Sequence, residues 1–125
     1  MITGFAPDMT TTRRFEAFRE PSDVQNGVIT LWIHDDAGHG EKVKPDVAAF
    51  TGSLLASHTV HMAGIPPSGR LRVTKDLHIR ENNGAVTLWI ISQSTGDQTY
   101  DGYEITVNTR DFVRELQGSG IQINW

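Results

Sequence analysis

Alternating apolar and polar positions predict several short antiparallel strands, and helical spacing appears at two places. Period-two alternation places one side chain of each pair on a buried face. Helical spacing follows Asp46 and Asn108, residue types that cap helix N-termini. We expect helices from Asp46 to about His58 and from Asn108 to about Leu116. Strands are expected at residues 13–20, 28–34, 41–44, 70–80, 86–92, 103–107 and 121–125.

One segment of the chain occurs twice. Residues 26–33 are NGVITLWI and residues 83–90 are NGAVTLWI, an offset of 57 positions. The correspondence resumes at an offset of 62, as in Gly40 with Gly102 and Phe50 with Phe112, which indicates a longer loop in the second copy. Two copies are too few for a solenoid. The sequence therefore predicts an α+β domain of two pseudo-symmetric βββα repeats, each an antiparallel sheet covered by one helix.

The expected organisation is a single domain over residues 1–125. Residues 1–12 are polar, without periodicity, and are expected to form an extended arm. The first repeat would span 13–63 and the second 70–125, with a turn-rich connector at 64–69. In the two helices the apolar side chains expected to face the sheets are Val47, Phe50, Leu54, Leu55, Phe112, Val113 and Leu116.

Each copy contains an Asn-Gly dipeptide between apolar runs, which is typical of a two-residue hairpin turn. A turn at Asn83-Gly84 places His78 opposite Trp89 and Leu77 opposite Ile90. Directly opposed residues share a face. One face is then apolar, with Leu71, Val73, Leu77, Ile79, Val86, Leu88 and Ile90. The other carries Arg70, Arg72, Thr74, Asp76, His78, Arg80, Thr87, Trp89 and Ile91. In the first copy Trp32 falls on the equivalent polar face.

Composition narrows the class of protein. The chain is 38% hydrophobic and 21% charged, with a formal net charge of −4 and no cysteine. Thiolate catalysis, disulfides and Cys-ligated zinc are therefore excluded. A long apolar run and a signal-peptide pattern are both missing, so we expect a cytoplasmic protein with no membrane partner.

Histidine and carboxylate groups are candidate metal ligands or catalysts. His34, Asp35, Asp36 and His39 lie in one segment, and His58 and His61 in another. Turn chemistry explains the first segment more simply, and the spacing of the second does not match a helical metal motif. Phosphate-binding loops, dinucleotide-binding motifs and serine-hydrolase motifs are absent. The sequence therefore predicts no metal, no cofactor and no enzymatic activity.

A polar sheet face with cations beside an aromatic ring suits nucleic acid, because phosphates pair with Arg and bases stack on Trp. The strand at 103–107 runs directly into the helix beginning at Asn108. This arrangement resembles the PUR-repeat family and its relatives of the PC4 and Whirly type, which bind single-stranded nucleic acid. The resemblance implies a single-stranded DNA or RNA partner. The expected contact residues are Arg70, Arg72, His78, Arg80, Trp89 and Trp32.

A second hypothesis remains open. Trp32 and Trp89 would be buried against each other, against Trp125, or in a homo-oligomer interface. The chain would then be an interaction or self-assembly protein, for example of a phage or another mobile element.

Overall fold

The computed structural model describes residues 1–65, 73–94 and 100–125. Its described part forms one small α+β unit, with an eight-stranded antiparallel sheet and three helices. The strands are β1 (Ile2–Phe5), β2 (Thr12–Phe18), β3 (Thr30–His34), β4 (Gly40–Val43), β5 (Thr59–Ile65), β6 (Val73–Asn82), β7 (Ala85–Ser94) and β8 (Tyr100–Asn108). The helices are α1 (Pro21–Asn26), α2 (Val47–Ser57) and α3 (Thr109–Gly118).

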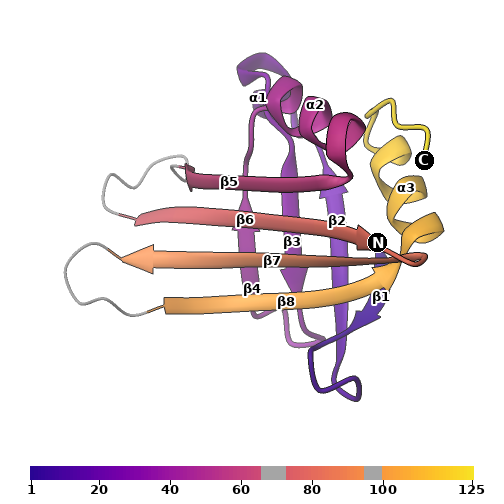
Figure 1. The fold of residues 1–125 in the computed structure, drawn as a ribbon. Helices are drawn as coiled ribbons and strands as arrows, with labels where there is room; N and C mark the ends of the chain where they lie inside the picture. Colours follow the sequence, from indigo (N-terminus) through magenta and orange to yellow (C-terminus); the bar gives the residue numbers. More distant parts are fainter. Residues whose placement is uncertain (66–72, 95–99) are drawn as a thin grey trace.

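The sheet folds into two layers. Its strand order is β4-β3-β2-β1-β8-β7-β6-β5, so the N-terminal and C-terminal strands form separate halves joined at β1 and β8. In Figure 1 strands β5–β8 form the front layer and run across the direction of β2–β4 behind them. Strand pairing therefore gives one continuous sheet, and the prediction of two separate sheets, each covered by one helix, is not what the structure shows.

The apolar faces of both layers meet in a single core. Phe15, Leu31 and Ile33 come from one half, while Leu77, Leu88 and Ile105 come from the other, and all are fully buried. Each longer helix contributes two buried side chains to this core. These are Phe50 and Leu54 of α2, and Phe112 and Leu116 of α3. Leu55, expected to face inward, is instead 51% exposed, because the buried face of α2 is narrow.

The segment expected to be an extended arm contains β1. This strand pairs with β2 along its length and with β8 at Phe5, opposite Thr106. Gly4 permits the junction, since a Cβ there would lie 2.3 Å from the Thr106 carbonyl oxygen. The strand has four residues, and its two large apolar residues, Ile2 and Phe5, are three positions apart, so period-two alternation does not reveal it.

The hairpin predicted at Asn83-Gly84 is confirmed. Both residues have positive φ, 53° and 81°, as a type I′ turn requires. The register is the one expected, with His78 opposite Trp89 and Leu77 opposite Ile90. The predicted helix caps are also present, because the Asp46 side chain accepts from Ala49 N–H and the Asn108 side chain from Arg110 N–H.

The hairpin predicted at Asn26-Gly27 is wrong, because a short helix ends there. Pro21 occupies its first turn, and Glu20 and Asp23 form a reciprocal capping box. Gly27 is its left-handed C-cap, with φ of 70°. The same dipeptide thus ends a helix in one place and turns a hairpin in another, since Gly accepts positive φ in both settings.

Two further expectations need correction. Strand β5 follows α2 directly, where the sequence suggested only the end of the first repeat. Residues 121–125 were expected to form a strand but do not. Ile121 N–H bonds back to the Leu116 carbonyl, and Ile121 and Ile123 are buried against the core. Residues 121–125 therefore pack against the core without forming a strand.

Candidate nucleic-acid interface

The outward surface of β5–β8 holds most of the predicted contact residues that the structure describes. His78 and Arg80 lie on β6 and Trp89 lies on β7, all on the side opposite the core residues. Arg70 and Arg72 fall outside the described residues. We call this surface the His–Trp face, and its members are Thr59, His61, Asp76, His78, Arg80, Thr87, Trp89 and Glu104.

Four side chains form a row across this face. The strand registers pair His61 with His78, His78 with Trp89, and Trp89 with Glu104. The imidazoles of His61 and His78 stack, with ring centroids 4.3 Å apart and planes at 26°. The indole of Trp89 follows at 5.7 Å from the His78 ring, tilted by 37°. Three aromatic rings on three neighbouring strands therefore form a ladder.

The indole of Trp89 lies over Gly102 and remains exposed to solvent. A Cβ at residue 102 would lie 2.7 Å from Trp89 Nε1, so the indole lies over Gly102 on β8. Trp89 is 43% exposed, a large value for a tryptophan in the middle of a sheet. The ring thus offers a flat apolar platform whose position depends on the missing side chain at residue 102.

A shallow groove runs beside the aromatic ladder. It has a volume of about 580 Å³. Its lining residues are Thr59, Val60, His61, His78, Ile79, Arg80, Asn82, Thr87, Trp89 and Glu104. Arg80 is exposed and opposes Thr87 and Thr59 in the register. The groove therefore combines one cation (Arg80), one carboxylate (Glu104), hydroxyl and imidazole groups, and a stacking surface.

Carboxylates also belong to the His–Trp face. Asp76 accepts a hydrogen bond from Gly64 N–H at 2.9 Å, which holds an irregularity in β5 in place. Within the described residues the Glu104 carboxylate makes no hydrogen bond or ion pair. The described charges on this face are therefore mixed: one cation, Arg80, and two carboxylates, Asp76 and Glu104.

Trp32 lies on the opposite side of the molecule. Leu31 and Ile33 point into the shared core, so Trp32 points outward from the other layer. Its ring stacks on His34 at 4.0 Å, and Lys42 Nζ lies 4.5 Å from its centroid. The structure therefore does not bring Trp32 together with Trp89, and neighbouring side chains already occupy the faces of its ring.

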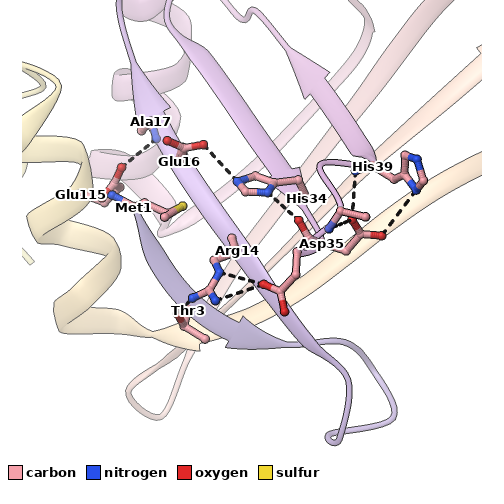
Figure 2. Close-up of polar contacts among 11 residues, drawn as sticks. Met1, Thr3, Arg14, Glu16, Ala17, His34, Asp35, His39 and Glu115 are labelled. Atoms are coloured by element: carbon pink, nitrogen blue, oxygen red, sulfur yellow. Dashed lines mark hydrogen bonds and ion pairs between the residues drawn. The ribbon is translucent and has the colours of Figure 1, made fainter.

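Polar contacts around His34 are shown in Figure 2. His34 Nε2 lies 3.0 Å from Glu16 Oε2, and Nδ1 lies 2.9 Å from the Asp35 carbonyl oxygen. Arg14 pairs with Asp36 and donates to Thr3 Oγ1. Both ring nitrogens of His34 are engaged and the residue is 8% exposed, so neither nitrogen is available to a substrate.

Candidate metal ligands do not converge. Among the residues that the structure describes, no three His, Asp or Glu side chains surround a common point. His39 is exposed on the β3–β4 loop, while His34 is buried. His58 is the left-handed C-cap of α2 and stacks on Trp125, with ring centroids 4.5 Å apart. His61 instead joins the aromatic ladder, so the histidines of the two candidate metal-binding segments have separate roles.

Four residues at the interface were not expected from the sequence: Thr59, His61, Gly102 and Glu104. His61 was overlooked because β5 was not predicted. The alternation of Thr59, Val60 and His61 after the helix end is the signal that points to this strand. Gly102 and Glu104 come from β8, whose register against β7 follows a loop and is not set by a tight turn.

In the part of the chain that the structure describes, no helix is both long and apolar enough to cross a membrane. Comparison with protein-family models, with curated proteins and with solved structures finds no match to this chain.

Proposed function

We propose that this chain is a non-enzymatic module that binds single-stranded DNA or RNA on the His–Trp face. The observation that carries the proposal is the half-exposed indole of Trp89, which lies at the end of a ladder of aromatic rings beside Arg80. Stacking of a base on such a ring is worth roughly 1–3 kcal/mol and tolerates any base, because every base has a π-face.

The outward face of a sheet suits a flexible strand better than a duplex. Its groove is shallow and open, and unpaired bases can reach the exposed ring of Trp89. Arg80 supplies a contact for phosphate, and Arg70 and Arg72, which fall outside the described residues, precede β6 in the sequence. The resemblance to PUR-repeat and related binders points to the same ligand class.

The internal repeat belongs to this proposal. Among the described residues, strands β1–β4 precede α2, and strands β5–β8 lie between α2 and α3. The repeated NGxxTLWI segment leads into β3 in one half and into β7 in the other. We propose that the halves are pseudo-symmetric copies that have diverged in surface. One copy covers its tryptophan with His34 and Lys42, whereas the other leaves Trp89 open.

Salt dependence tests the proposal directly. Binding of a labelled single-stranded oligonucleotide, measured by fluorescence anisotropy, should weaken steeply as salt rises, because neutralised phosphates release counterions. Arg80→Ala should weaken binding and lower the slope of log K against log salt by about 0.7. Arg110→Ala, at an exposed position of α3, is the matched control and should change neither value much. Absence of binding at low salt would reject the proposed function.

A homo-oligomer interface is the second candidate, and one observation favours it. Phe5 is 44% exposed, and its register with Thr106 places it on the same outward surface as Trp89. Two large exposed aromatic side chains on one face are typical of a protein interface. Light scattering separates the candidates. A dimer that Trp89→Ala and Phe5→Ala dissociate, together with no oligonucleotide binding, would favour assembly.

A further inference from the structure

The stacked pair of His61 and His78 has an electrostatic consequence. Two positively charged imidazoles with ring centroids 4.3 Å apart would repel one another, as like charges do at this distance. An anion bound against both rings would remove that repulsion and favour the doubly protonated pair. A pair of this kind therefore couples anion binding to the uptake of protons.

No fixed anion of the described structure fills that role. His34, His39 and His58 each lie within 4.0 Å of a carboxylate oxygen, at Glu16, Asp35 and Glu81 respectively. Within the described residues, His61 and His78 make no such pair.

The charged groups facing the pair come from its own strands and their neighbours. On β6, Asp76 and Arg80 flank His78 on the same face, and the Asp76 carboxylate is engaged with Gly64 N–H. On β8, Glu104 stands beyond Trp89 in the row. Arg80 and Glu104 are the charged side chains that line the groove with the two imidazoles. Arg80 follows His78 on the same face of β6, whereas Glu104 is separated from His78 by Trp89.

We infer that His61, His78 and Arg80 form a phosphate subsite, at which a phosphodiester of the bound strand is held as the imidazoles take up protons. This inference rests on the proposed function and specifies how the strand lies. The base would stack on Trp89 while its phosphate contacts the neighbouring imidazoles. The strand would therefore cross β5, β6 and β7 along the aromatic ladder. Histidine suits this role because its charge changes between about pH 5 and pH 8.

A metal ion is a poorer occupant of the same pair. The ring planes are only 26° from parallel, so the in-plane lone pairs of the two imidazoles do not converge on one point. No third ligand from the described residues is near them. A phosphate group, with its several oxygen acceptors, can accept hydrogen bonds from the N–H groups of both stacked imidazoles, whereas a single metal ion cannot lie in both ring planes.

The test measures affinity for an oligothymidylate between about pH 5 and pH 8, at constant ionic strength. Thymine has no group that titrates in this range, so the pH dependence reports on the protein. Affinity of the wild-type chain should rise about tenfold or more as pH falls, because each linked proton contributes up to tenfold per pH unit. The double variant His61→Gln, His78→Gln should bind at high pH but gain less than about threefold.

His39→Gln is the matched control, since it removes an exposed imidazole from a distant loop and should keep the wild-type pH dependence. Circular dichroism and thermal melts would show that the double variant remains folded. Binding that is independent of pH, or a double variant that keeps the full pH dependence, would overturn the phosphate subsite while leaving the proposed function standing. Absence of oligothymidylate binding at every pH would overturn both.

Discussion

Gly102 lies directly beneath the indole of Trp89, and a Cβ at residue 102 would come within 2.7 Å of Trp89 Nε1. Gly102→Ala should therefore displace the ring from its place on the sheet. The indole can rotate away, so we expect a stability loss of about 1 kcal/mol or less. Oligonucleotide affinity should fall several-fold, because a moved ring loses part of a stacking contact worth roughly 1–3 kcal/mol. Titration of the variant and its thermal melt check both values.

Gly118→Ala provides the control for that substitution. Gly118 is the exposed last residue of α3, and a Cβ there meets nothing within 4 Å. The Gly118→Ala variant should keep the wild-type affinity. If Gly102→Ala binds as tightly as the wild type, the position of the Trp89 ring is irrelevant to binding.

The two tryptophans of the repeated segment should respond differently to removal. Trp89→Ala should lower affinity by about 1–3 kcal/mol with little loss of stability, because its ring is exposed. Trp32→Ala should leave affinity within about twofold and cost about 1–2 kcal/mol of stability, since it loses contacts with His34 and Lys42. Urea denaturation and anisotropy titration measure the two quantities. Equal losses of affinity for both variants would show that binding does not distinguish the faces.

Asp23 is the buried carboxylate that ties α1 to the sheet. It is 1% exposed and accepts from Lys44 Nζ, Thr30 Oγ1 and Glu20 N–H. Burial raises its pKa, but the hydrogen bond from Lys44, with those from Glu20 N–H and Thr30, outweighs burial and holds the pKa below the usual 3.8. Asp23→Asn should cost about 2–3 kcal/mol at neutral pH, because Lys44 loses its charged partner.

The pH dependence of that loss has a definite sign. A carboxyl with a depressed pKa stabilises the fold above its unfolded value and loses this contribution as pH falls through the folded value. The stability difference between wild type and Asp23→Asn should therefore be constant above about pH 5 and shrink below pH 3.8. Asp36→Asn, whose side chain is 72% exposed, is the control and should change stability by less than about 1 kcal/mol. A difference that grows in acid would contradict the assignment.

Local signals account for the parts of the fold that the sequence predicts. The β6–β7 hairpin follows from Asn83-Gly84, because a tight turn fixes the register of both strands and so the face of every side chain. Asp46 and Asn108 likewise predict where α2 and α3 begin, because each side chain accepts a hydrogen bond from a backbone N–H in the first turn of its helix.

Features that depend on distant residues could not be predicted in this way. β1 pairs with β2 along its length and also meets β8, where Gly4 allows a close approach to Thr106. That second partner lies more than 100 positions away, and nothing near Gly4 indicates it. The first Asn-Gly ends a helix because Pro21 and the Glu20 capping box start one just before it. In the interface, the polar face of β6 and β7 is evident from alternation, whereas the pairing of His61 with His78 requires a strand order that alternation does not encode.

Quenching of Trp89 fluorescence by an unlabelled single-stranded oligonucleotide at low salt tests most directly whether the His–Trp face binds nucleic acid. The chain would carry Trp32→Phe and Trp125→Phe, with circular dichroism matching the wild type, so that Trp89 alone emits. We expect saturable quenching that is reversed by added salt. Unchanged emission at every oligonucleotide concentration, from a folded variant with Trp89 exposed, would contradict binding on this face.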